Sequence, residues 1–317
     1  MCGNIILLSK YRFAVMTKSL FSFLLCLAVT CFSANARTAE IDTAQLFTSV
    51  AELRAEIEQI RVVMGEPLPP SREVRIHDAV PRHVFYQAQT LFRKSNQFAQ
   101  QMAGVSRQPP RLAPEGDIGS ADVLGVLDDT RVQIGLVKTA LGIDAPVAEA
   151  KLDRRARPSD VLYDIIEAGR VINFISGRTV DWTTVYDRVL LAITYVGGAL
   201  PEADRFPPLS PFEPGKFPQD IIGRLQQCME LSREPAAEHG VAVLRVESIR
   251  RTEVGPTVIE VLDMATIVLS DLAELTYEMG AEDVPTPDYP RPNRVFPSHV
   301  FQLVGVLVAQ LEMLAGN

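Results

Sequence analysis

Apolar residues recur along most of the chain in alternating steps of four and three positions. From Val84, for example, the stripe passes through Leu91 and Phe98. Stripes with the same spacing start at Val123, Val161, Val185, Ile221, Val258 and Val300. A repeat that averages about 3.5 residues gathers apolar side chains on one helix face and favours shallow-angle packing between helices. We therefore predict an all-α protein, with helical bundles made from about seven or eight amphipathic helices in heptad-like register.

A short motif precedes these stripes and predicts where the helices begin. It starts with proline at Pro81, Pro158, Pro218 and Pro297, and looser forms start at Ser120, Trp182 and Gly255. Proline suits the first helical position, because the amide hydrogen that it lacks would have no partner there. The nearly regular spacing of the motif suggests internal repeats, each made of a helix and a loop.

An eighth helix is expected in front of these seven. Apolar residues from Leu46 to Met64 keep the same spacing, with charged residues between them. This segment could be a short coiled coil that pairs two chains, or a helix that docks on the protein's own bundle. It is shorter than the roughly three to four heptads that indicate a coiled coil, so we favour the docked helix.

Long proline-rich loops join most of the helices and suggest the domain boundaries. The segment from Pro201 to Pro218 contains six prolines and is the best boundary. We expect a signal peptide at 1–36, a helix and proline-rich linker at 37–80, a four-helix bundle at 81–200, a linker at 201–217 and a C-terminal helical bundle at 218–317.

Two other connections lead to more local predictions. The turn Ser176-Gly177-Arg178-Thr179 is short, so the helices on either side should form an antiparallel hairpin. The segment from Gly240 to Ile249 fits either a short strand or a continued helix.

The N-terminal segment 1–36 has the features of a secretory signal peptide. Its only charges are Lys10, Arg12 and Lys18, and an apolar run at 20–32 leads to Ala-Asn-Ala at 34–36. A basic start, a short apolar run and an A-x-A site are typical of a cleaved leader. The run is shorter than the roughly 18–20 residues that span a membrane. We expect cleavage after Ala36 and export to the periplasm or out of the cell.

Alternatives for this segment concern its start and its fate. Met16 would serve as a start as well as Met1. The segment could also stay as an uncleaved anchor, or the chain could carry a lipid at Cys31. Thr30 stands where a lipoprotein site normally has Gly, Ala or Ser, so the lipid is the weaker alternative.

Removal of the leader changes the composition of the protein. The full chain has a net charge of −8, and loss of the basic leader makes the mature protein more acidic. An acidic surface disfavours nucleic acid, whose phosphates need a basic patch. Of the four cysteines only Cys228 remains, so stability must come from an apolar core and not from an internal disulfide. We expect no transmembrane segment after cleavage.

Two histidines at matched places are candidates for chemistry. His83 and His299 occupy the third position of the proline motif, in Pro-Arg-His-Val-Phe and Pro-Ser-His-Val-Phe. They could be a symmetric pair of ligands or acid–base groups. Asp160 and Asp220 fill the same position in sister motifs, which indicates a capping role in the first helical turn. We favour the capping role.

Other candidate residues have simpler explanations. Cys228 lies within an apolar stripe and is expected to be a core residue. Arg170 and Asn173 could bind a small anion, although polar residues beside an apolar stripe are common. The helix at 300–314 is apolar nearly all round, which indicates a central place in the core or a face covered by a partner. We assign no catalytic, cofactor-binding or metal-binding residue, because no motif for such a site stands out.

Three hypotheses for function follow. The first is an exported scaffold or protein-interaction protein without catalytic activity, which binds a protein partner or associates with itself. The alternative is a sensor-like bundle that binds a small ligand, and the least favoured is an enzyme with an unrecognised site. A large exposed apolar patch would favour the first hypothesis, and a buried polar cavity would favour the second.

Overall fold

The computed structural model describes residues 42–69, 74–114, 116–177, 181–248 and 255–316. The predicted signal peptide, its cleavage after Ala36 and the choice between Met1 and Met16 therefore lie outside the described residues.

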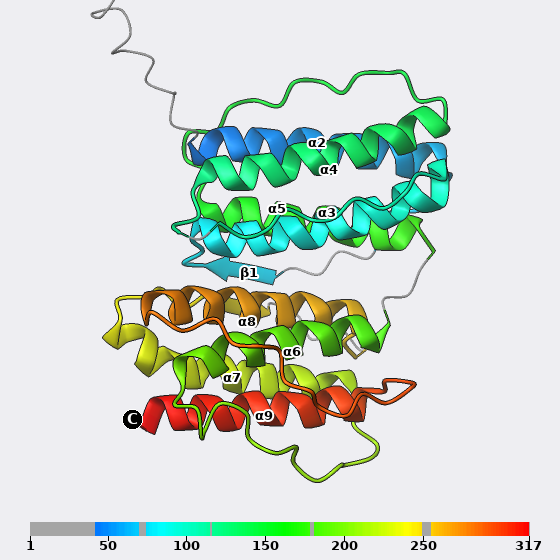
Figure 1. Cartoon of the computed structure of the whole chain (residues 1–317). Helices are drawn as coiled ribbons and strands as arrows, with labels where there is room; N and C mark the ends of the chain where they lie inside the picture. The colour runs from blue at the N-terminus through cyan, green and yellow to red at the C-terminus, as the bar shows by residue number, and fades with distance from the viewer. Residues whose placement is uncertain (1–41, 70–73, 115, 178–180, 249–254, 317) are drawn as a thin grey trace, which may run out of the picture. The chain divides into compact units, whose positions relative to one another are not determined.

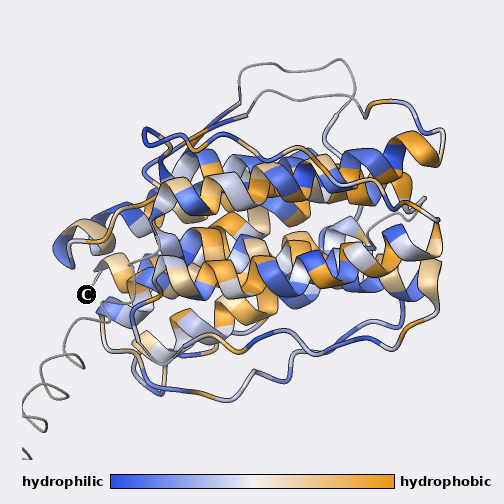
Figure 2. Ribbon diagram, turned by 90° about the horizontal axis from the view of Figure 1, so that it is seen from above, coloured by the Kyte–Doolittle hydropathy of each residue, from blue (hydrophilic) through white to orange (hydrophobic). Residues whose placement is uncertain are grey.

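Eight helices account for most of the described residues (Figure 1). They are α2 (Thr43–Val63), α3 (Pro81–Ala103), α4 (Ser120–Ala140), α5 (Pro158–Ile175), α6 (Trp182–Ala199), α7 (Pro218–Glu238), α8 (Val258–Glu278) and α9 (Pro297–Gly316). The helices alternate between hydrophobic and hydrophilic residues, as amphipathic helices do (Figure 2). The predicted all-α fold is confirmed. Six of the seven motifs mark the first residue of a helix, whereas α8 begins at Val258, three residues after the start of its motif at Gly255.

The residue at the third helical position explains why these helices start where they do. In α3 and α9 the Nδ1 atoms of His83 and His299 each accept the N–H of the residue just before the helix, at 3.0 Å. The carboxylates of Asp160 in α5 and Asp220 in α7 accept the corresponding N–H at 2.8 and 2.7 Å. Each bond satisfies a backbone donor that the helix itself leaves free. The capping interpretation of these four residues is confirmed.

Helices α2 to α5 form a four-helix bundle, which we call the first bundle. In it α2 and α3 each pack against both α4 and α5, so α2 and α3 occupy opposite corners. The apolar stripe of α2 faces the inside, with Val50, Leu53 and Ile57 fully buried. The helix predicted at 46–64 is therefore the docked helix that we favoured.

Helices α6 to α9 form a second bundle with the same order of contacts. In it α6 and α7 each pack against both α8 and α9. This grouping differs from the expected division into 81–200 and 218–317, which placed α6 with α3, α4 and α5. The chain passes from one bundle to the other directly after α5, and the proline-rich segment 201–217 joins two helices of the same bundle.

The predicted hairpin between α5 and α6 is wrong. Helix α5 packs against α2 and α3, whereas α6 packs against α8 and α9, and there is no extensive contact between α5 and α6. Their short connection limits how far apart the two helix ends can lie. It does not decide which helix faces meet, because each apolar face is already covered by other partners.

A two-stranded ribbon joins two connections that are far apart in the sequence. Strand β1 (Val74–His77) pairs antiparallel with β2 (Arg245–Ser248), and Val74 lies opposite Ser248. Beside the ribbon, Arg245 donates to a carboxylate oxygen of Asp78 at 2.7 Å. The ambiguous segment 240–249 therefore contains a strand, and its partner lies in the connection between α2 and α3.

The last helix, α9, is covered by the chain itself. By length and apolar composition it meets the criteria for a membrane-spanning helix, which our sequence expectation did not recognise. A buried core helix meets the same criteria, and 56% of this stretch is buried inside the structure. The side chains of Gln302 and Gln310 donate to the backbone oxygens of Ser210 and Arg205. The proline-rich segment 201–217 therefore lies along α9. It covers part of the helix surface that we had expected to be buried in the core or against a partner.

Candidate functional site

Charged side chains link the two bundles at the place where α3 packs against α8, which we call the bundle junction. Arg82 of α3 pairs with Glu274 of α8. About three helical turns further along α3, the Nζ atom of Lys94 lies 3.6 Å from a carboxylate oxygen of Asp263. The junction is therefore held by charge pairs as well as by apolar contacts.

His83 is fully buried in the bundle junction and has a structural role. Because its Nδ1 accepts the N–H of Val80, its ring proton is on Nε2. Nε2 lies 2.9 Å from Oδ1 of Asp271, in a close polar contact that is not aligned as a hydrogen bond. The same Asp271 oxygen accepts the N–H of Leu244 at 3.0 Å. Both ring nitrogens of His83 thus face a partner, and neither is open to a substrate.

His299 starts a helix of the other bundle. Its ring packs against those of Phe212 and Phe296, with centroids 4.9 and 5.8 Å apart. Helices α3 and α9 do not pack against each other. The two histidines with matched motifs therefore do not form the symmetric pair of ligands that their sequences allowed.

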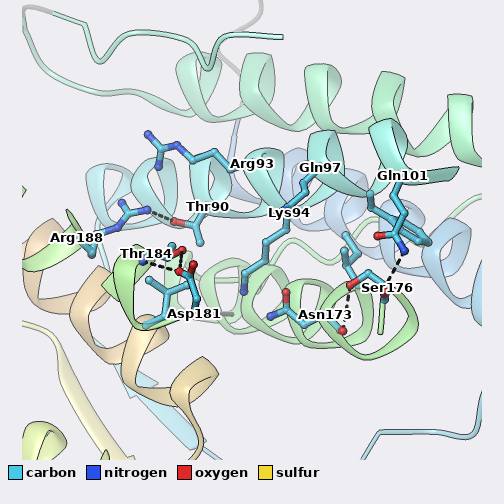
Figure 3. Close-up of a pocket in the computed structure, with 13 residues that line it drawn as sticks. Thr90, Arg93, Lys94, Gln97, Gln101, Asn173, Ser176, Asp181, Thr184 and Arg188 are labelled. Carbon is cyan, nitrogen blue, oxygen red and sulfur yellow. Dashed lines mark hydrogen bonds between the residues drawn. The ribbon is translucent and has the colours of Figure 1, made fainter. Parts of the chain in front are cut away.

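A cavity of about 180 Å³ lies at the bundle junction (Figure 3). Its walls come from α3 and α5 of the first bundle and from α6 and α8 of the second. Helix α3 contributes Thr90, Lys94, Gln97 and Gln101, whose spacing places them on one helix face. Gln101 donates to the backbone oxygen of Ser176 at 3.2 Å. Most of the polar groups that line the cavity are hydrogen-bond donors or cations.

Arg188 of α6 is the buried cation of this cavity. Its exposed fraction is 7%, and one guanidinium nitrogen donates to the hydroxyl of Thr90 at 3.2 Å. No ion pair between described residues includes Arg188, and the exposed carboxylate of Asp181 lines the same cavity. Burial, and then the positive charge of Arg93, lowers the pKa of Arg188 to about 9, so the group is still protonated at neutral pH. A buried charge without an opposite charge costs stability.

Two further donors reach the cavity from the first bundle. The Lys94 side chain is only 9% exposed, and Gly169 of α5 makes room for it. A Cβ atom at position 169 would lie 3.1 Å from Lys94 Nζ. The Nδ2 atom of Asn173 is buried and has no acceptor among the described residues. Arg188, Lys94 and Asn173 thus give the cavity three buried or largely buried hydrogen-bond donors, and Lys94 also faces the carboxylate of Asp263.

Arg170, the other residue that we considered for anion binding, lies behind the cavity wall. It pairs with Glu167 and lies 3.9 Å from a carboxylate oxygen of Asp263. Burial raises the pKa of Glu167, and Arg170 partly opposes this increase. Of the two residues singled out in the sequence, only Asn173 reaches the cavity.

The sequence analysis missed Arg188 and Lys94, although both have the same unusual spacing relative to the apolar stripe of their helix. Arg188 lies three positions after Val185 and four before Ala192, and Lys94 has this relation to Leu91 and Phe98. Each cation thus occupies the apolar face of its helix. A charged residue on a buried face needs an opposite charge, so this pattern marks a candidate site.

The remaining candidates add no second site. Cys228 is fully buried and burial raises the pKa of its thiol, which confirms that it is a core residue. The described part of the chain holds no group of three or more side chains that could bind a metal ion. Comparison with protein-family models, with curated proteins and with solved structures found no match.

Proposed function

We propose that the protein is a non-enzymatic binding protein for a small anion, which occupies the cavity at the bundle junction. The observation that carries this proposal is Arg188, a buried cation that forms no ion pair with another described residue. A bound anion would supply the missing charge and accept two parallel hydrogen bonds from the guanidinium. A polar cavity with buried cations and an exposed rim also favours the small-ligand hypothesis over the scaffold.

The position of the cavity supports a sensor-like role. Its walls belong to both bundles, so a bound anion would contact α3 and α5 as well as α6 and α8. A ligand stabilises the arrangement to which it binds. Anion binding would therefore hold the two bundles together at their junction.

The test of this function is Arg188→Met, which removes the charge but keeps an unbranched side chain. Sodium acetate, butyrate, succinate, phosphate and sulfate are each titrated at constant ionic strength, with calorimetry and thermal denaturation as readouts. We expect at least one salt to bind the unaltered protein and raise its melting temperature, and none to do so in the variant. Without a ligand the variant should be the more stable of the two, because it lacks the buried unbalanced charge.

A matched control is Arg224→Met on α7. This guanidinium lies over the ring of Phe301 at 3.6 Å, away from the cavity. The control should lose some stability and keep the response to anions. The proposal is overturned if no anion binds the unaltered protein, or if Arg188→Met binds as well as the control.

Export is a second proposal, and the leader-like segment 1–36 supports it. The measurement is the intact mass of the protein recovered from the periplasm or the medium. We expect the mass of a chain that begins after Ala36. Recovery only from the cytoplasm, at the mass of the full chain, would contradict export.

We also propose that the two bundles arose by duplication. Their helices meet in the same order, and one bond recurs in both. Ser159 of α5 accepts the N–H of Ala79, and Ser298 of α9 accepts the N–H of Lys216, both at 3.1 Å. Each donor lies two residues before the proline that starts the second helix of its bundle. The repeated unit would then be four helices, and not one helix with its loop.

A further inference from the structure

The charges around the cavity define how much negative charge its ligand can carry. Largely buried cations at or just behind the wall are Lys94, Arg170 and Arg188, and the largely buried carboxylates are Glu167 and Asp263. This leaves an excess of one positive charge. At the exposed rim, the positive charge of Arg93 and the negative charge of Asp181 cancel each other in this sum. One negative charge would balance the site, whereas a second would be buried without a partner.

The apolar part of the wall excludes a compact inorganic ion as the best fit. Phe98, Ile172 and Leu262 line the cavity, and their exposed fractions are 1%, 1% and 3%. These side chains come from α3, α5 and α8, so they surround the polar groups from both bundles. A hydrocarbon chain that lies against these side chains removes its own methylene groups from water, and a phosphate ion has no such gain.

The volume sets the length of such a chain. A cavity of about 150 Å³ in a protein core holds one benzene molecule. The cavity here measures about 180 Å³, which leaves space for slightly more atoms than benzene has. A carboxylate with about four to six carbons has this size.

We propose that the ligand is a singly charged carboxylate with a short apolar chain and about four to six carbons in total. Its carboxylate pairs with the guanidinium of Arg188, and its chain lies against Phe98, Ile172 and Leu262. Lys94 and Asn173 line the same cavity (Figure 3), and they would accommodate a polar substituent on the ligand. This inference rests on the proposed function, because it names the class of anion that Arg188 binds.

A titration series tests the ligand class. Acetate, butyrate, hexanoate, succinate and phosphate are compared by calorimetry at equal ionic strength and neutral pH. We expect affinity to rise about fourfold for each methylene from acetate to butyrate, because each added group leaves water for the apolar wall. Succinate should bind at least about tenfold more weakly than butyrate, because its second charge lacks a partner. Phosphate should bind at least about tenfold more weakly as well, because it has no hydrocarbon chain to place against the apolar wall.

The outcomes separate this inference from the function on which it rests. If succinate or phosphate binds as tightly as butyrate and requires Arg188, the ligand class is overturned and anion binding stands. If affinity does not change with chain length, the role of the apolar wall is overturned. If none of the salts binds, the proposed function itself fails.

A variant of the wall gives a second measurement. Leu262→Phe places a larger apolar side chain at the cavity and reduces the space for a long ligand. The affinity for hexanoate should fall at least about tenfold, whereas the affinity for acetate should not change. The position of the melting transition shows whether this variant is folded. Unchanged binding of hexanoate by a folded variant would overturn the inference that the chain lies against Leu262.

Discussion

In both bundles the helices contact one another in the same order. The bundles differ because one capping residue of the first bundle lies in contact with the second bundle. In the first bundle the capping residues of α3 and α5 are His83 and Asp160, and in the second those of α7 and α9 are Asp220 and His299. All four accept the N–H of the residue before the helix. Only His83 also faces a buried carboxylate, that of Asp271. Local geometry therefore decides which residues suit the position, and contact between the bundles decides what else the residue does.

The largest difference between the bundles should appear when the two histidines are replaced. We expect His83→Ala to lower the free energy of unfolding by about 3 kcal/mol, because it leaves the Asp271 carboxylate buried without its partner. His299→Ala removes a capping bond and the ring contacts with Phe212 and Phe296 at a partly exposed position, without leaving a buried charge, and should cost about 1 kcal/mol. Urea denaturation at neutral pH measures both values.

Helix content is the control for this pair. Circular dichroism should show that each variant keeps its helices under native conditions. Equal losses from the two replacements would contradict the special role of His83 at the bundle junction. A larger loss from His299→Ala would reverse the comparison.

A smaller effect should be equal in the two bundles. Ser159→Ala and Ser298→Ala each remove the acceptor of one backbone N–H, that of Ala79 or Lys216. We expect each replacement to cost about 1 kcal/mol, because the N–H then has no partner in the protein. Thermal and urea denaturation of both variants check this. Losses that differ by more than about 1 kcal/mol would weaken the proposal that the bundles are copies of one unit.

Sequence alone was enough for the local features of this fold. The spacing of apolar residues predicted each helix, and the third-position residues predicted the caps, because both depend on neighbours within one or two turns. The grouping of helices was not predictable in this way. Pairing of α5 with α6 was expected from a short turn, but the partners of a helix depend on every other apolar face in the protein.

The candidate site was only partly predictable for the same reason. Arg188 and Lys94 lie on the apolar faces of their helices, which could have marked them as unusual. Nothing local shows that the two face the same cavity, because that depends on how α3 of one bundle meets α6 and α8 of the other. Likewise, β1 and β2 each contain four residues, and neither forms a ribbon without the distant partner strand.

The position of α9 in the second bundle has a consequence for the order in which the protein folds as it is synthesised. The first bundle uses only contacts among α2 to α5, so it can close once α5 has left the ribosome. In the second bundle, α6 and α7 each lack one partner until α9 emerges as the last of the eight helices. Vectorial synthesis thus gives a folded N-terminal half joined to an open C-terminal half. Because α6 and α8 form one side of the cavity, the cavity is complete only when the final helix closes the second bundle, and the ligand binding that we propose would begin at that point.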